Sequence, residues 1–290
     1  MNNSIIRYHI ILYLEKRNNR ALKKLRKILI NYLEANSKND DEFKVLNYIK
    51  KNELTTFLPN IKNHQSVEIL VYKDNCSGLR YVIHNGKKLF FKKVMSDKEI
   101  VKYYRSLLIE QDPSSPHYYF SCGAEVREKD VVLDIGAAEG IFALEIIEKA
   151  KKVYLIEGDL SWIEPLKETF RPWRDKVTII PRYVSDVNTE EFLTLDRLFF
   201  GNEVNFIKMD IEGHEEKALR GADFLLSSNA DLTIVACSYH THQAENNLRR
   251  ILYEKGFSVE ISSGYMIFFD GEKLQPPYLR RGLVVGKKRR

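Results

Sequence analysis

The chain has 290 residues, 44% of them hydrophobic and 30% charged, a composition typical of a globular protein. That length suits one principal domain with a sizeable extension. Its three cysteines form neither a CxxC pair nor a Cys/His cluster, which argues against a disulfide framework and a structural zinc site. Residues 1–35 and 275–290 each carry a charge of +6 and the rest of the chain −6, so the net charge of +6 does not indicate the basic groove of a nucleic-acid enzyme.

A basic amphipathic helix is predicted near the start, because apolar residues recur at three- and four-residue spacing from Leu22 to Leu33 with Lys and Arg between them. Residues 42–49 predict a second, shorter helix. The start of the chain shows no run of the ~18 apolar residues that a spanning helix needs and no secretory cleavage site, which favours a cytoplasmic location. Residues 16–33 could rest on the inner face of an anionic membrane. A solvated helix or a contact between copies in a homo-oligomer is the alternative.

Short β-type runs follow at residues 67–72, 81–84 and 89–91. Asn85-Gly86, between the second and the third run, predicts a tight β-hairpin. A helix is expected over residues 97–109, and the proline-containing segment 112–116 ends it. We therefore assign residues 1–95 to an N-terminal extension of helices and β-hairpin, and residues 96–290 to the main domain.

From residue 131 onward strands and helices alternate. The predicted strands span 131–135, 152–157, 177–181, 204–209, 232–237, 257–261, 265–269 and 283–285, and the predicted helices span 141–150, 162–170, 192–199, 217–226 and 244–255. The first strand is an uninterrupted apolar run apart from its aspartate, typical of a strand buried on both faces. The alternation predicts an α/β fold with an open, mostly parallel sheet, helices on both faces, and a ligand at the carboxyl ends of the strands.

The first strand-to-helix turn of such a sheet contacts the cofactor, and here it runs Asp134-Ile135-Gly136-Ala137-Ala138-Glu139-Gly140. A nicotinamide fingerprint would need glycine at 138 and 141, where alanine and isoleucine stand. S-adenosylmethionine has no pyrophosphate, so a tight turn at Gly136 and a small residue at Gly140 suffice for its amino-acid end. We expect Ala137 and Glu139 to line this turn, and Asp134 to hold the ammonium directly or through water. A plain turn that needs glycine for positive φ is the alternative.

Carboxylates at the ends of the next two strands are the other candidate cofactor ligands. Glu157 lies 17 residues after Gly140, about where an acid accepts both ribose hydroxyls. Gly158 follows it in the same loop. After the third strand, Ser185-Asp186 puts a carboxylate where it could accept the adenine amino group, with a local Asx turn as the competing interpretation.

Acidic residues are unusually dense after the fourth strand, in the run Asp210-Ile211-Glu212-Gly213-His214-Glu215. Such carboxylates could bind a hydroxyl-rich substrate, a divalent metal or the cofactor, or cap the next helix. Asp210 and Glu212 are our candidates for function. His240 follows the neighbouring fifth strand, and a neutral imidazole there suits a general base that takes a proton from a hydroxyl group. We predict no metal site, although a divalent cation would suit the carboxylates.

These segments together resemble the FkbM family of S-adenosylmethionine-dependent methyltransferases. The resemblance rests on Val131–Gly140, on Ile207–Glu215, which matches the family's KxDxEGxE run, and on Ala236–His240. It implies a Rossmann-like class I methyltransferase fold with a seven-stranded sheet. It also implies that Asp134, Gly136, Gly140 and Glu157 bind the cofactor, and that Asp210 and Glu212 line the methyl-transfer site opposite His240. Gly158 stands where many relatives have proline.

Members of that family methylate hydroxyl groups of sugars, glycolipids or polyketides, so the resemblance implies an O-methyltransferase in glycan biosynthesis with a carbohydrate or glycolipid acceptor. A nucleic-acid methyltransferase that uses the basic termini is one rival. Amino-directed base methylation usually relies on an Asn/Asp-Pro-Pro-aromatic run after the fourth strand, where this chain has Asp210–Gly213. A cofactor-binding scaffold without catalytic activity is the other rival.

Overall fold

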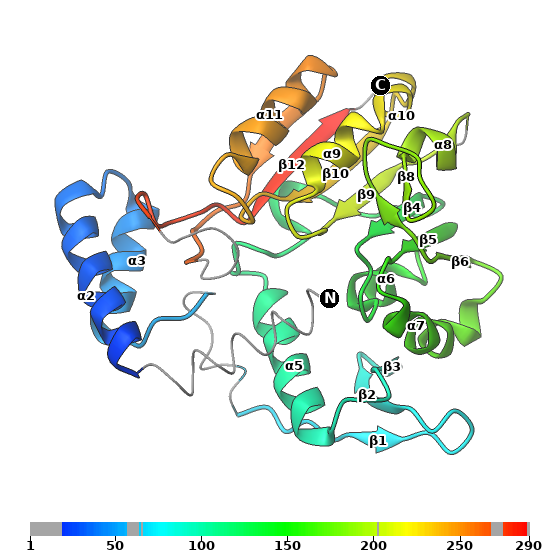
Figure 1. Cartoon of the computed structure of the whole chain (residues 1–290), viewed down its shortest axis with the longest axis horizontal. Coiled ribbons are helices and arrows are strands. Elements are labelled where there is room, and N and C mark those ends of the chain that lie inside the picture. Colours follow the sequence, from blue (N-terminus) through cyan, green and yellow to red (C-terminus); the bar gives the residue numbers. More distant parts are fainter. Residues whose placement is uncertain (1–18, 57–63, 65, 202, 268–274, 289–290) are drawn as a thin grey trace.

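A computed structural model describes residues 19–56, 64, 66–201, 203–267 and 275–288. Its centre is a seven-stranded sheet in the order β11-β12-β10-β9-β4-β5-β6 (Figure 1). The strands of this sheet are β4 (Val131–Ile135), β5 (Lys152–Ile156), β6 (Val177–Ile180), β9 (Phe206–Met209), β10 (Leu232–Cys237), β11 (Ser258–Ile261) and β12 (Leu283–Lys288). β12 runs antiparallel between β10 and β11, and the other pairs are parallel. This order confirms the predicted class I methyltransferase fold.

Helices cover both faces of the sheet. They are α5 (Asp97–Glu110), α6 (Ile141–Ile146), α7 (Ile163–Thr169), α8 (Leu195–Phe199), α9 (Glu215–Arg220), α10 (Asp223–Ser228) and α11 (Ala244–Glu254). Apolar residues of α5, α6 and α7 belong to one core cluster, and those of the four later helices to a second. The central strands contribute alternate side chains to the two clusters, which explains why β10 is buried along its whole length.

Two predicted helices differ in the structure because neighbouring loops interrupt them. Residues 192–199 begin as β8 (Phe192–Leu193), which pairs with β7 (Tyr183–Val184), and only then form α8. The predicted helix 217–226 is divided into α9 and α10 at Gly221. A Cβ atom at Gly221 would lie 2.2 Å from the carbonyl oxygen of Ser185, so the loop after β7 needs the glycine there.

The predicted strands at 67–72 and 265–269 are largely wrong. The first is reduced to β1 (Tyr72–Lys73), because only these two residues pair with the neighbouring strand. The second shows a single bridge between Met266 and Arg280, and residues 268–269 lie outside the described part of the chain. Without a longer partner strand, the β-type pattern alone does not produce a ladder.

The predicted β-hairpin is present and packs against the sheet domain. β2 (Arg80–His84) and β3 (Lys87–Phe90) are joined by Asn85 and Gly86, whose φ values of 49° and 79° fit a two-residue turn with two left-handed positions. Val82 and Leu89 of the hairpin belong to the same core cluster as α6 and α7. The hairpin therefore shares the core of the sheet, and the boundary near residue 95 stays a prediction.

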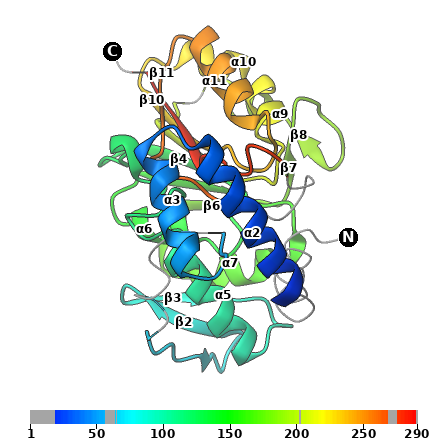
Figure 2. The same cartoon turned by 90° about the vertical axis from the view of Figure 1, so that its left-hand side faces the viewer.

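Helices α2 (Asn19–Asn36) and α3 (Asp40–Lys51) form a pair at the opposite end of the long axis from α8 and β6 (Figure 1). They lie side by side (Figure 2) and pack on the segment that leads into β12, through a cluster that includes Ile49, Ile267 and Leu279. Each helix alone exposes an apolar stripe, which the other helix and this segment bury together.

The basic surface of α2 remains open to solvent at Lys23, Lys24 and Lys27. Arg26 instead donates hydrogen bonds to the carbonyl oxygens of Ile49 and Lys50, so it ties α2 to α3. Residues 16–18 of the predicted membrane-facing helix lie outside the described part, and membrane contact stays a prediction. No helix among the described residues is long and apolar enough to cross a membrane.

Candidate active site

The carboxyl ends of β4, β5, β9 and β10 meet at one edge of the sheet, since all four strands are parallel neighbours. Every candidate site residue named from the sequence follows one of these strands or β7, except Asp134, which lies inside β4. Two groups can be distinguished at this edge. We call the group at the ends of β4 and β5 the cofactor half, and the group at the ends of β9 and β10 the acceptor half.

The glycines of the first turn are required by close packing of the chain itself. Gly136 has φ +75°, and a Cβ atom there would lie 1.9 Å from the carbonyl oxygen of Asp210. Gly140 precedes α6 and has φ +87°. A Cβ atom there would lie 2.7 Å from the ring of Phe170. Gly136 thus brings the end of β4 into contact with the end of β9. A direct cofactor contact of Gly136, Ala137 or Gly140 stays a prediction.

Glu139 lies buried in this turn and contacts α5. The hydroxyl group of Tyr103 donates a hydrogen bond of 2.7 Å to its Oε2. Burial raises the pKa of Glu139, and the bond from Tyr103 opposes that shift. The helix before the sheet therefore covers the turn, a contact that the sequence did not predict because the two residues belong to separate elements.

Asp134 is paired with a lysine of the chain. Lys208 Nζ lies 3.0 Å from its Oδ1 and donates to the carbonyl oxygen of Gly136 at 2.8 Å. Both side chains are buried; burial raises the pKa of Asp134, and Lys208 opposes the shift. Lys208 thus occupies a position where the sequence predicts the cofactor's ammonium, and a role of Asp134 in cofactor binding stays a prediction.

Glu157 is held at the end of β5 by two backbone donors. Its carboxylate accepts hydrogen bonds from the backbone N–H groups of Ala138, at 2.8 Å, and Asp159, at 2.6 Å. Burial raises the pKa of Glu157, whereas these two bonds lower it. Each carboxylate oxygen can accept a further bond, so the orientation suits two ribose hydroxyls. The rest of the loop is formed by Gly158, where a Cβ atom would lie 2.2 Å from the ring of Tyr183.

Ser185 and Asp186 make their contacts elsewhere. The carbonyl oxygen of Ser185 packs on Gly221 after α9, and the Ser185 hydroxyl donates to Asp186 at 3.1 Å. Among the hydrogen bonds of the described residues, none joins Asp186 to Glu157. Tyr183 is the residue after β6 that contacts the loop of Glu157 and Gly158, so the adenine role of Ser185 and Asp186 stays a prediction.

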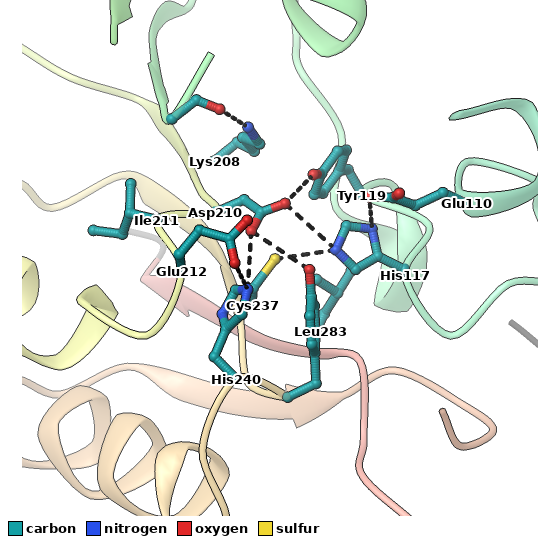
Figure 3. Close-up of polar contacts among 12 residues, drawn as sticks. Glu110, His117, Tyr119, Lys208, Asp210, Ile211, Glu212, Cys237, His240 and Leu283 are labelled. Atoms are coloured by element: carbon teal, nitrogen blue, oxygen red, sulfur yellow. Dashed lines mark hydrogen bonds and ion pairs between the residues drawn. The ribbon is translucent and has the colours of Figure 1, made fainter. Parts of the chain in front are cut away.

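The acceptor half brings together the three residues predicted for catalysis (Figure 3). Nε2 of His240 lies 3.5 Å from Oδ1 of Asp210 and 3.4 Å from Oε2 of Glu212. Glu212 and Gly213 have φ values of +57° and +92°. A left-handed backbone conformation is costly for a residue with a side chain, such as Glu212. In this conformation the Glu212 carboxylate lies beside His240.

Glu215 orients the imidazole from the other side. Its Oε1 lies 3.1 Å from Nδ1 of His240 and accepts a hydrogen bond of 2.9 Å from the backbone of Ile211. Burial alone would lower the pKa of His240, but the carboxylates of Glu215, Asp210 and Glu212 outweigh it and raise this pKa above its usual value. Because Glu215 lies at Nδ1, Nε2 is the ring nitrogen that faces Asp210 and Glu212.

A second histidine, which the sequence did not single out, lies on the far side of Asp210. Fully buried His117 has Nε2 3.7 Å from Oδ2 of Asp210 and Nδ1 3.1 Å from Glu110, and Tyr119 donates to the same Oδ2 at 3.1 Å (Figure 3). The Pro-His-Tyr-Tyr-Phe run at 116–120 is the signal that could have found it. Asp210 is thus held between two imidazoles.

Arg280 fixes the backbone that carries His240. Its guanidinium donates to the carbonyl oxygens of Tyr239 and His240, and its second nitrogen lies 2.9 Å from Nδ1 of His242. The neighbouring Arg281 binds Asp41 of α3 at 2.9 Å and the carbonyl oxygen of Gly264. The N-terminal helix pair is therefore tied to the segment that supports the acceptor half.

Comparison with known proteins shows which proteins parts of this chain resemble. The model of the methyltransferase FkbM domain matches residues 182–259, which include β9, the acidic run and His240. A protein named probable ribosomal RNA small subunit methyltransferase A from Methanococcoides burtonii is 42% identical over 69 residues, 24% of this chain and 25% of that protein. Ribosomal RNA small subunit methyltransferase A from Clostridium botulinum is 34% identical over 71 residues, 24% of this chain and 26% of that protein. The chain matches only about a quarter of these relatives' length.

Several solved methyltransferases are similar to this chain at low sequence identity. Precorrin-6y C5,15-methyltransferase from Geobacter metallireducens is 14% identical, with a TM-score of 0.41, over 57% of this chain and 83% of that one. An rRNA methylase from Streptococcus thermophilus is 13% identical, with a TM-score of 0.37, over 57% and 90%. The fold class rests on the strand order above and not on these distant likenesses. The match to the methyltransferase FkbM domain, at residues 182–259, therefore covers the acceptor half.

Proposed function

We propose that the chain transfers the methyl group of S-adenosylmethionine to a hydroxyl group of a sugar, glycan or glycolipid. The observation that carries this proposal is the acceptor half, where Asp210, Glu212 and His240 converge beside the first turn. Methyl transfer to a hydroxyl needs groups that orient the O–H and receive its proton. Carboxylates and an imidazole do both, and carboxylates accept hydrogen bonds from the several hydroxyls of a sugar.

The cofactor half fits S-adenosylmethionine in its donor set. Glu157 would accept from the ribose hydroxyls, the turn 136–140 would hold the amino-acid end, and Tyr183 beside Gly158 offers a ring to the adenine. A pyrophosphate could not approach Gly136 and Gly140 closely, because Asp210 and Phe170 already occupy the space beside their Cα atoms. The cofactor supplies an electrophilic methyl group on a sulfonium, and the carboxylates of the acceptor half suit that positive charge.

The acceptor half receives the proton that the acceptor hydroxyl loses during methyl transfer. Glu215 fixes Nδ1 of His240, so Nε2 is the nitrogen presented to an acceptor hydroxyl held by Asp210 and Glu212. The carboxylates of Glu215, Asp210 and Glu212 raise the pKa of His240, which favours an imidazole that accepts a proton. The proton of the hydroxyl then passes to the cluster formed by His240, Asp210 and Glu212.

Ribosomal RNA methylation is the second candidate, favoured by the names of the curated relatives. Two features of the site oppose it. The segment after β9 is Asp210-Ile211-Glu212-Gly213, without the prolines and aromatic residue typical of amino-directed base methylation. Four carboxylates each lie within 3.5 Å of a ring nitrogen of His117 or His240, those of Glu110, Asp210, Glu212 and Glu215. This density of negative charge disfavours the approach of a polyanion.

The test is a methyl-transfer assay with isotopically labelled cofactor against a panel of sugars and glycolipids and against ribosomal RNA. We expect transfer to a carbohydrate, and a loss of at least ~100-fold in His240→Ala with binding of S-adenosylhomocysteine unchanged. Transfer to RNA alone would establish the second candidate. A protein that binds S-adenosylhomocysteine but methylates nothing in either panel would be a scaffold, and a protein that fails to bind it would refute the methyltransferase proposal.

A further inference from the structure

The acceptor half has the geometry of a cation site. Asp210, Glu212 and His240 each offer one ligand atom, and these three atoms lie within 4.8 Å of one another. The distances from Nε2 of His240 to the two carboxylate oxygens, 3.5 and 3.4 Å, are longer than ordinary hydrogen bonds. Two atoms bound at about 2.1 Å to one cation lie about 3.0 Å apart at a right angle and about 3.4 Å apart in a tetrahedron.

The imidazole is oriented as a metal ligand usually is. His240 is only 5% exposed, and Oε1 of Glu215 lies 3.1 Å from its Nδ1. Nε2 faces the carboxylates of Asp210 and Glu212 (Figure 3). A carboxylate on the outer nitrogen of a ligating histidine is the common arrangement in protein metal sites. The three ligands come from the ends of two neighbouring strands, so the sheet holds them at fixed separation.

A second possible ligand group shares Asp210 but is enclosed. His117, Asp210 and Cys237 also lie within ligand distance of one another, and His117 and Cys237 are completely buried. An ion there would have no open position for water or substrate. Glu212, by contrast, lies at the surface of the site with a side chain 36% exposed, so an ion beside it keeps positions that an acceptor can occupy.

We infer that Asp210, Glu212 and His240 bind one divalent cation, and that this cation holds the acceptor hydroxyl. Two carboxylates and one imidazole suit Mn²⁺ or Mg²⁺, because hard oxygen donors predominate and no thiolate takes part. The inference deepens the proposed hydroxyl methylation and rests on it for the role of the ion. It also names an acceptor class, a sugar with two neighbouring hydroxyls that can chelate the open positions.

In this arrangement His240 would hold the cation through Nε2, and the cation would supply the charge that lowers the pKa of the acceptor hydroxyl. The acceptor O–H would pass its proton to the carboxylate of Glu212, and from there to water. The O–CH₃ bond forms as the S–CH₃ bond breaks, with the electron pair of that bond remaining on sulfur. No oxidant or reductant is needed.

The experiment measures Mn²⁺ binding to the full chain without turnover, by the loss of the electron paramagnetic resonance signal of free Mn²⁺. Wild type, Glu212→Gln and His240→Gln are compared, with Glu216→Gln as the matched control. Glu216 lies next to Glu215, but its side chain binds Arg220 and Asn247 away from the site. Thermal unfolding and S-adenosylhomocysteine binding show that each variant is folded.

We expect one Mn²⁺ per wild-type chain, affinity at least ~10-fold weaker in Glu212→Gln and in His240→Gln, and no change in Glu216→Gln. Methyl transfer should be lost in a chelator and restored by Mn²⁺ or Mg²⁺. No binding at millimolar Mn²⁺ by a protein that still binds S-adenosylhomocysteine would overturn the cation site and leave the methyltransferase proposal standing. Equal binding by all variants would place any ion elsewhere and would likewise overturn the inference.

Discussion

In the cofactor half, backbone N–H groups hold the carboxylate of Glu157, and Lys208 pairs with Asp134. In the acceptor half, the carboxylates lie beside the imidazole of His240. Glu157 accepts two backbone bonds shorter than 3 Å. Nε2 of His240 lies 3.5 Å from Oδ1 of Asp210 and 3.4 Å from Oε2 of Glu212. In the cofactor half, the hydrogen bonds within the chain already fix the carboxylate of Glu157, and a ligand would add further bonds to it. In the acceptor half, the carboxylates of Asp210 and Glu212 lie close enough to each other for a proton, a cation or a hydroxyl-rich acceptor to bridge them.

The two halves touch at Gly136, and a side chain there should give the largest effect. Gly136→Ala would place a Cβ atom 1.9 Å from the carbonyl oxygen of Asp210 at φ +75°. Gly78, with φ +71° and nothing within 4 Å, offers a matched control that suffers the backbone strain alone. We expect Gly136→Ala to lower the free energy of unfolding by at least ~2 kcal/mol more than Gly78→Ala, measured by urea unfolding. Equal losses would show that the halves are not in contact at this point.

Breaking the cofactor half alone should give the next largest effect. Glu157→Ala removes a carboxylate that two backbone donors hold in place for the ribose. Because hydrogen bonds to a charged group contribute about 1.5–3 kcal/mol, affinity for S-adenosylhomocysteine should fall about 10- to 100-fold in calorimetry.

The control for Glu157 comes from the other half of the edge. His240→Gln should change S-adenosylhomocysteine affinity by less than ~3-fold, because its imidazole contacts Asp210, Glu212 and Glu215 and not the ribose side. A comparable loss of affinity in both variants would mean that the two halves act as one unit.

The smallest effect should come from the N-terminal helix pair. Arg281 holds the pKa of Asp41 at about 2, below its usual 3.8, through a direct hydrogen bond. A lowered pKa stabilises the folded state above the unfolded value and is lost as pH falls through the folded value. Asp41→Asn should therefore lower stability by about 1 kcal/mol at neutral pH, and the difference from wild type should shrink below pH ~4.

Asp40→Asn is the matched control for Asp41. Both residues lie in the first turn of α3, so both substitutions weaken the same interaction with the helix dipole. Thermal unfolding across the acid range measures the two together. A pH-dependent difference of the same size in Asp40→Asn would assign the effect to the helix end and not to the contact with Arg281.

The sequence determined the main features of the site because parallel strands bring their carboxyl ends to one edge. Once the strand at 131–135 and the acidic run after 209 were recognised, Glu157, Asp210, Glu212 and His240 had to lie along that edge, and the structure places them there. The spacing of apolar residues also predicted α2, and the Asn85-Gly86 pair predicted the hairpin turn. These features depend on local spacing, which the chain carries without reference to distant residues.

Only the tertiary structure decided which side chains meet. Lys208 reaches Asp134, Tyr103 covers Glu139, and His117 comes from the segment before β4 to lie behind Asp210. The same holds for Arg280 and Arg281, which link the helix pair to the backbone of His240. Each contact joins residues from different elements, so it depends on how the elements pack, and packing is set by the shape of the whole core rather than by the spacing of residues along the chain.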